Sequence, residues 1–341
     1  MNPDPQPNTK ETLAHPQAIL IRTPNWLGDL MMSTAFIRAV LEQFPNAAVD
    51  LVVRKGFEHL PLPRRGQVLP YDKKTQRPGA FGRHLRERGY SHFFVLPPSL
   101  SSAWMAFQSR IPHRIGHPGQ GRWFFLRPSI PPQQPPRSVH LLQEYMELLT
   151  PWGLQKLSYP AGLEATPQWL QKHLPVILDN LGPYVVLAPG AEYGPAKQWP
   201  LSHYQELARR LSLAGHTVVV VGLLKEQAAG EEILHDVRNG LNLCGKTALV
   251  ELAAVLARAK LLVSNDSGAM HLGAAMGIPQ IAIFGSTNPT WTAPLNPKAI
   301  IITNNLPCAP CYKRTCPMGH TRCLTEILPH DVMEEAMALL G

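Results

Sequence analysis

The sequence of 341 residues has no apolar run of about 18 residues, the length that a helix needs to cross a bilayer. Its first residues, Met1 to Pro16, are polar and rich in proline, and they lack the apolar core of a signal peptide. Charged residues make up only 16% of the chain, against 45% hydrophobic residues. This balance is typical of a globular chain. We therefore expect a cytoplasmic protein with a disordered extension over residues 1–17.

The first predicted strand–helix unit lacks the GxGxxG turn with which many such units bind a dinucleotide. We expect a strand over Ala18–Ile21 and a helix from Leu30 to Phe44. Only Gly28 and the neighbouring Asp29 stand between them. A carboxylate at the carboxyl end of a strand lies where α/β sheets place their chemistry. Alternatively, Asp29 simply caps the helix.

Strands alternate with helices in both halves of the chain, which predicts parallel, doubly wound sheets. The second half begins anew with predicted strands over Tyr184–Ala188, His216–Val221, Lys260–Val263 and Gln280–Gly285. The length is that of two domains of ordinary size. We expect an α/β protein with two Rossmann-like domains that face each other across a cleft. The expected boundaries are 18–175 and 176–330, with a last helix over 331–341 that packs back on the body.

The stretch Ser264–Ala275 has the pattern of a strand, a polar turn and a helix. Ser267 and Gly268 open this helix and leave backbone N–H groups free for a phosphate. Asp266 and His271 flank that end, so that an anion site and two ionisable groups would share one cleft. The alternative is again an ordinary helix cap.

Lys197 lies in a loop rich in glycine and proline after the predicted strand Tyr184–Ala188. Its ammonium group could neutralise a departing diphosphate, unless it is a surface lysine. Four of the five cysteines gather near the C-terminus, at Cys308, Cys311, Cys316 and Cys323. Only the first pair has the spacing of zinc ligands, so we favour reduced structural thiols over a zinc site.

The positive charge is confined to the first half of the chain. Residues 1–150 hold 18 Lys and Arg against 10 Asp and Glu, whereas residues 151–341 hold 14 of each. This asymmetry indicates an anionic partner for the first half: a nucleic acid, a phosphorylated substrate or an anionic membrane surface. A merely soluble basic surface is the alternative. The basic residues are not interleaved with aromatic residues in a nucleic-acid motif, so we expect no nucleic-acid partner.

Three motifs in this order resemble those of glycosyltransferase family 9, the lipopolysaccharide-core heptosyltransferases. They are Asn25–Ser33, Pro189–Pro200 and Asn265–His271, and the cysteine-rich segment Cys311–His320 accompanies them. The resemblance covers the chain from about Ala18 to the C-terminus. It implies the GT-B architecture, with the acceptor on domain 18–175 and ADP-heptose on domain 176–330.

The resemblance also implies a reaction: an inverting, metal-independent transfer of heptose from ADP-heptose to the first heptose of the lipopolysaccharide inner core. Asp29 would be the catalytic base, and Lys197 would stabilise the ADP leaving group. The donor would bind at Gly190, Glu192, Thr247, Asp266, Ser267, Gly268 and His271. Ser267 stands where the family often has threonine, and the hydroxyl is kept. Our candidates for acceptor contacts are Trp26, Gly28, Arg54, Lys55 and Arg114.

The expected partners are ADP-heptose and a lipid A–Kdo–heptose acceptor at the cytoplasmic face of the inner membrane, and we expect a monomer without a cofactor. Phosphates and Kdo carboxylates of the acceptor would then match the basic first half. Three alternatives remain open: heptosyltransferase I or another family 9 enzyme with a different acceptor, a sugar-nucleotide epimerase of the same fold, and a nucleic-acid-binding protein.

Overall fold

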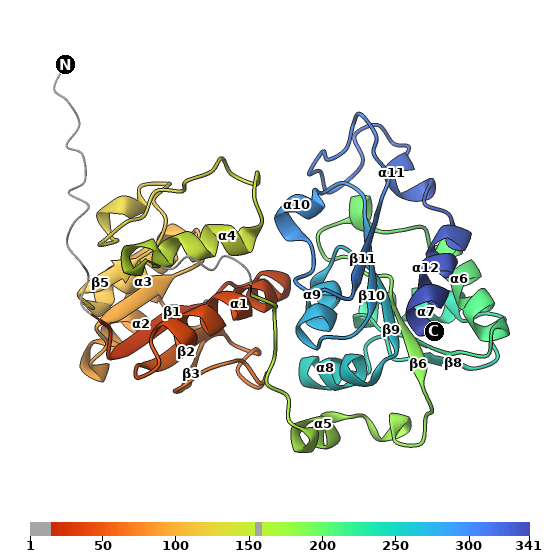
Figure 1. Ribbon diagram of the computed structural model, residues 1–341, viewed down its shortest axis with the longest axis horizontal. Coiled ribbons are helices and arrows are strands. Elements are labelled where there is room, and N and C mark those ends of the chain that lie inside the picture. The colour runs from red at the N-terminus through yellow and green to blue at the C-terminus, as the bar shows by residue number, and fades with distance from the viewer. Residues whose placement is uncertain (1–14, 154–158) are drawn as a thin grey trace.

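The computed structural model describes residues 15–153 and 159–341 (Figure 1). The expected extension over residues 1–17 therefore falls almost wholly outside the described residues. Two parallel sheets organise the chain, one in each half. We call the parts built on them the N-terminal and C-terminal domains. None of the helices in the described ranges has both the length and the apolar character to cross a membrane.

The N-terminal sheet has the strand order β3-β2-β1-β4-β5, and all of its pairings are parallel. Its strands are β1 (Ala18–Arg22), β2 (Ala48–Arg54), β3 (Val68–Tyr71), β4 (His92–Val95) and β5 (His113–Ile115). The helices around it are α1 (Leu27–Gln43), α2 (Pro78–His84), α3 (Leu100–Ser109) and α4 (Leu141–Met146), with short 3-10 turns η1 (Arg86–Arg88), η2 (Arg122–Phe124) and η3 (Glu147–Trp152).

Both faces of this sheet are covered because successive side chains of a strand point to opposite sides. In β1, Ile19 and Ile21 join the cluster that includes α1 and α4, whereas Leu20 joins the cluster that includes α3. All three side chains are fully buried. Burial of one such side chain contributes roughly 1.5–3 kcal/mol. The apolar run in β1 is thus explained by helices on both sides.

The C-terminal sheet has the order β11-β10-β9-β6-β7-β8, again with parallel pairings. Its strands are β6 (Tyr184–Ala188), β7 (Thr217–Val220), β8 (Gly240–Asn242), β9 (Leu261–Asn265), β10 (Gln280–Phe284) and β11 (Ala299–Thr303). Its helices are α6 (Leu201–Leu213), α7 (Gln227–Ile233), α8 (Leu249–Arg258), α9 (Gly268–Ala275), α10 (Pro289–Thr292), α11 (Arg322–Thr325) and α12 (Pro329–Leu340), and α5 (Pro167–His173) precedes the sheet. The 3-10 turns are η4 (Val176–Leu178), η5 (Pro195–Lys197) and η6 (Leu224–Glu226).

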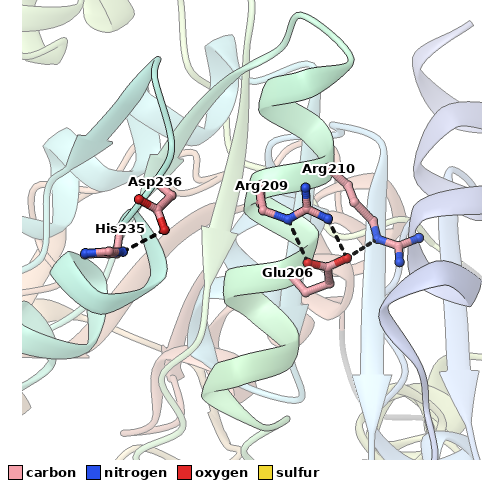
Figure 2. Close-up of polar contacts among 5 residues, drawn as sticks. All are labelled: Glu206, Arg209, Arg210, His235 and Asp236. Carbon is pink, nitrogen blue, oxygen red and sulfur yellow. Dashed lines mark hydrogen bonds and ion pairs between the residues drawn. The ribbon is translucent and has the colours of Figure 1, made fainter.

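Helix α12 packs on α6 and on the sheet beside it (Figure 1). Helix α6 also carries a network in which Arg209 and Arg210 donate to Glu206 at 2.9 and 2.6 Å (Figure 2). These bonds lower the pKa of Glu206 to about 2. Exposed pairs of this kind contribute about 0–1 kcal/mol to stability. The network therefore has no part in positioning the cleft.

The two domains meet where α1 and α9 begin. A Cβ atom added to Gly268 would stand 3.2 Å from the side chain of Leu27, in the first turn of α1. At a second contact, His140 Nε2 donates to the backbone oxygen of Ala293, 2.9 Å away. Both helices follow the carboxyl end of a strand, β1 or β9. The carboxyl ends of the two sheets therefore face each other, as the cleft of the predicted architecture requires.

Several predicted boundaries were wrong. Helix α1 begins at Leu27 and not at Leu30, and the last helix, α12, begins at Pro329 and not at residue 331. No range was predicted for α2, α3, α10, α11, β8 and β11.

Candidate active site

Asp29 lies in the first turn of α1, at the edge of the N-terminal sheet that faces the C-terminal domain. It is not the helix cap, because the N-cap position is Trp26, which makes no capping bond with its side chain. Burial raises the pKa of Asp29 to about 6. The charge of Lys197 lowers this pKa and the charge of Asp266 raises it, so that the three groups share one region. A carboxylate with a pKa near 6 is suited to accept a proton at neutral pH.

Lys197 and Asp266 form an ion pair, and they follow the neighbouring strands β6 and β9 of the C-terminal sheet. The ammonium group donates to Asp266 Oδ2, and the two side chains are only 12% and 4% exposed. Thr287 Oγ1 also donates to Asp266 Oδ2, at 2.6 Å. Thr287 was not among the residues predicted from the sequence. The pair presents one buried cation at the carboxyl ends of β6 and β9, where a departing anion would need it.

The loop that carries Lys197 is fixed by Asn265, the last residue of β9. The side-chain oxygen of Asn265 accepts from the backbone N–H of Trp199 at 3.0 Å, and its Nδ2 donates to the backbone oxygen of Pro189 at 2.6 Å. Asn265 is fully buried. One side chain thus holds both ends of the 189–200 loop to the strand that precedes Asp266, which sets where Lys197 lies.

The start of α9 offers unused hydrogen-bonding groups. Ser267 is the N-cap residue but makes no capping bond, and its buried Oγ has no hydrogen-bond partner among the described residues. The buried Nδ1 of His271 has none either. Burial lowers the pKa of His271 to about 4, so its imidazole is neutral at pH 7. Free N–H groups of the first helical turn, a free hydroxyl and Lys197 nearby form a site for an anion.

The other predicted donor residues lie further along the same edge. Gly190 lies against Glu226, since an added Cβ would stand 2.3 Å from Glu226 Oε1. Glu192 pairs instead with Lys225, at 2.9 Å in an exposed position, and this bond lowers the pKa of Glu192. Thr247 lies in the loop between β8 and α8. The structure therefore brings Asp266, Ser267 and His271 together with Lys197, and places Glu192 in a separate pair.

The predicted acceptor residues are dispersed. Trp26 is 61% exposed beside the start of α1, and Gly28 packs against His271. Arg54 donates to the backbone oxygen of Asn25, and Lys55 lies 3.8 Å from Asp72.

Arg114 lies apart from the other predicted acceptor residues, on the edge strand β5. Its guanidinium donates to the backbone oxygens of Phe125 and Ile111, at 3.0 and 2.6 Å. Its guanidinium group therefore tethers a loop.

Arg22, at the end of β1, was not singled out from the sequence. Arg22 is 2% exposed. Its guanidinium group donates to the backbone oxygens of Thr23 and Val52 and to the side-chain oxygen of Asn25. Among the described residues it has no carboxylate partner. Burial lowers its pKa to about 10. It lines a pocket next to the loop that leads to Asp29, together with Asn25, Tyr71, Lys73, Ser101, Ser102 and Met105.

The four C-terminal cysteines line one pocket together with His320 and Ala196, the neighbour of Lys197. All four are free thiols. In the part of the chain that the structure describes, no three His, Cys, Asp or Glu side chains are arranged to hold a metal ion. The cysteine-rich segment instead supports the loop that carries Lys197. The backbone N–H of Ala196 donates to the backbone oxygen of Arg314 at 3.0 Å, and Tyr193 Oη donates to the backbone oxygen of Tyr312 at 2.7 Å.

The chain is similar to known glycosyltransferases. Residues 79–322 match the family model of glycosyltransferase family 9 (heptosyltransferase). The chain is 32% identical to lipopolysaccharide heptosyltransferase 2 of Escherichia coli K12, over 94% of this chain and 98% of that protein. It is 34% identical to lipooligosaccharide heptosyltransferase 2 of Haemophilus influenzae, over 83% and 88%.

A solved structure agrees with the architecture. The E. coli ADP-heptose lps heptosyltransferase II superposes with a TM-score of 0.81 at 31% identity, covering 95% of this chain and 98% of that one. The E. coli heptosyltransferase WaaC with ADP shares the fold, with a TM-score of 0.74 at 20% identity. The predicted GT-B fold is thereby confirmed. The chain belongs to glycosyltransferase family 9, and it is a glycosyltransferase of the heptosyltransferase class.

Proposed function

We propose that this protein transfers heptose from ADP-heptose to the first heptose of the lipopolysaccharide inner core, with inversion at the anomeric carbon. The observation that carries the proposal is the meeting of Asp29, from one domain, with the Lys197–Asp266 pair, from the other. The similarity to heptosyltransferases 2 over nearly the whole chain supports the choice of donor and acceptor.

In this mechanism Asp29 accepts the proton of the acceptor hydroxyl while that oxygen attacks the anomeric carbon of heptose. The bond from the anomeric carbon to the diphosphate oxygen breaks, and its electron pair leaves with ADP. A general base of this kind contributes typically 10²–10⁴ in rate. Its raised pKa of about 6 leaves Asp29 ionised at neutral pH, yet basic enough to take the proton.

The negative charge that develops on ADP is stabilised on the opposite side of the cleft. Lys197 supplies a buried positive charge, and the start of α9 supplies N–H donors beside the Ser267 hydroxyl. Charges and dipoles that are already in place cost no rearrangement during the reaction. In this mechanism Asp266 orients Lys197, and the base is Asp29. This division of roles needs no metal ion.

The acceptor class follows from the charge of the N-terminal domain. Its excess of basic residues matches an acceptor that carries phosphates and Kdo carboxylates at a membrane surface. Heptosyltransferase I activity differs only in the acceptor, and the donor site cannot distinguish the two. We locate the reaction on the cytoplasmic side of the inner membrane, where ADP-heptose and the lipid acceptor would meet.

The test is a transfer assay that follows ADP release. The protein is incubated with ADP-heptose and one of two acceptors, Kdo–lipid A without heptose or the same acceptor with one heptose. The proposal predicts ADP release with the one-heptose acceptor and little with the heptose-free one. The reverse preference would identify a heptosyltransferase I, and a changed sugar without any acceptor would identify an epimerase.

A further inference from the structure

Five aromatic rings form a continuous surface on α3 and η2 of the N-terminal domain. We call this set the aromatic patch: Trp104, Phe107, Trp123, Phe124 and Phe125. Ring centroids lie 5.6 Å apart for Trp104 and Phe107, 6.5 Å for Phe107 and Phe124, and 6.0 Å for Trp123 and Phe124. Trp123 and Phe124 are 63% and 66% exposed. Two adjacent large aromatic rings with this much exposure are uncommon on the surface of a monomeric protein, and exposed apolar patches often mark interaction sites.

Arginines outnumber acidic residues around the patch. The sequence from residue 88 to residue 143 contains six arginines and no Asp or Glu. Arg114 stands over the ring of Phe107 at 5.9 Å, and Arg110 is the exposed residue that ends α3. Arg86 donates to the backbone oxygen of Gln108 at 2.8 Å, and the charges of Arg110 and Arg83 help burial to lower its pKa. The patch thus has an excess of guanidinium groups beside it.

This combination fits the headgroup region of an anionic bilayer. Tryptophan and other aromatic rings are favoured at the boundary between headgroups and acyl chains. Arg and Lys side chains near an anionic leaflet are attracted to its lipid phosphates. A protein partner would need a matching acidic surface, and a second copy of this chain would bring the same positive charge against itself. Charge therefore favours the membrane among the possible occupants.

The place of the patch in the domain suits a lipid-linked acceptor. Helix α3 begins beside the pocket of Arg22, which Ser101 and Ser102 line. Trp104 and Phe107 follow on the same helix within two turns, which is about 5–9 Å further along its axis. A bilayer under the patch would then contact a helix that starts at the same edge of the N-terminal sheet as α1, the helix of Asp29.

We propose that the aromatic patch, with the arginines around it, is the surface by which the N-terminal domain docks on an anionic lipid bilayer. Trp123 and Phe124 insert among the headgroups, and Arg86 and Arg110 contact lipid phosphates. The idea rests on the proposed function in one respect only, because a lipid-linked acceptor gives the enzyme a reason to be at a membrane.

The test is sedimentation of the full chain with vesicles of phosphatidylcholine, with and without phosphatidylglycerol, in the absence of substrates. The variant is Trp123→Ser/Phe124→Ser. The matched control is Val176→Ser/Ile177→Ser, which removes two other exposed apolar side chains, 82% and 60% exposed, in η4. We expect binding to the anionic vesicles to fall about tenfold or more in the variant and to stay unchanged in the control.

A second variant, Arg86→Gln/Arg110→Gln, keeps the rings and should reduce the preference for phosphatidylglycerol and the sensitivity to salt. Equal vesicle binding by wild type and the Trp123→Ser/Phe124→Ser variant would overturn the proposal. The proposal would also be overturned if ultracentrifugation showed that wild type is a dimer and that Trp123→Ser/Phe124→Ser is a monomer, because the patch would then bind a second copy of the chain. Transfer to a delipidated, soluble acceptor should be the same in all variants; its failure in wild type would refute the proposed function alone.

Discussion

Gly28 of the N-terminal domain packs directly against the imidazole ring of His271 in the C-terminal domain. A Cβ atom added to Gly28 would stand 2.7 Å from His271 Cδ2, closer than carbon atoms approach without a shift. Gly28 immediately precedes Asp29, and His271 belongs to the same helical turn as Ser267 and Gly268. The contact therefore fixes the distance between the proposed base and the proposed donor site.

The first prediction concerns this contact. Gly28→Ala should push α1 and α9 apart by a few tenths of an ångström and lower kcat about tenfold or more, because catalytic groups tolerate little misplacement. The control is Gly182→Ala, since an added Cβ at Gly182 meets nothing within 4 Å. Steady-state kinetics of both variants give the answer. Wild-type turnover in Gly28→Ala would show that the domain spacing at this contact does not matter.

The second prediction concerns the buried ion pair. Lys197→Ala should weaken ADP binding in calorimetry and also destabilise the protein by roughly 3–5 kcal/mol, because Asp266 keeps its charge and loses its main partner. Lys225→Ala breaks an exposed lysine–carboxylate pair of ordinary geometry, that with Glu192, and should leave the stability almost unchanged because solvent screens this pair. Equal ADP affinity in wild type and Lys197→Ala would remove this lysine from the donor site, whatever the stability result.

The third prediction concerns the cost of keeping Asp29 ionised. Its pKa is raised from 3.8 to about 6 in the folded protein, so the fold binds its proton more tightly than the unfolded chain does. The stabilisation from this proton is complete below the unfolded value and is lost as the pH rises through about 6. Above that pH the ionised Asp29 costs on the order of 3 kcal/mol.

Asp29→Asn should therefore raise the free energy of unfolding at about pH 8 and leave it nearly unchanged at about pH 4. The same variant should lose a factor on the order of 10² in kcat while its ADP affinity stays close to that of wild type. Urea unfolding at the two pH values measures the first effect. Asp72→Asn is the control of opposite sign, because hydrogen bonds and nearby lysines lower the pKa of exposed Asp72. If Asp29→Asn were less stable than wild type at about pH 8, that result would contradict the raised pKa of the buried Asp29 carboxyl group.

The sequence predicted secondary structure correctly where the local pattern and the tertiary packing favour the same element. Strands β6, β9 and β10 are fully buried apolar runs, and their places were predicted correctly. Helix α2 was missed because its two glycines have low helix propensity. In the structure Gly82 lies so close to α3 that an added Cβ would stand 2.2 Å from the backbone oxygen of Met105. Packing against a distant helix selected that glycine, and no local pattern shows it.

The structure brings the candidate residues Asp29, Lys197 and Asp266 together, and the sequence did not indicate the residues that hold them in place. Asp29, Lys197 and Asp266 stand at the carboxyl ends of predicted strands, so the fold class alone places them at one edge. Thr287 reaches Asp266 from the loop after β10, and Asn265 fixes the Lys197 loop through three hydrogen-bond partners. These are contacts between segments far apart in the chain. Their geometry depends on side-chain packing, which sequence spacing does not encode.

The most direct test of the whole account is the pH dependence of kcat/KM for transfer from ADP-heptose to the one-heptose acceptor. For wild type we expect kcat/KM to fall on the acid side of the profile with an apparent pKa of about 6, that of Asp29. The charge of Asp266 raises this pKa, so the acid limb should move to lower pH in Asp266→Asn. The charge of Lys197 lowers this pKa, so the acid limb should move to higher pH in Lys197→Gln. A limb near the ordinary aspartate value of 3.8, unmoved by either substitution, would contradict Asp29 as the base.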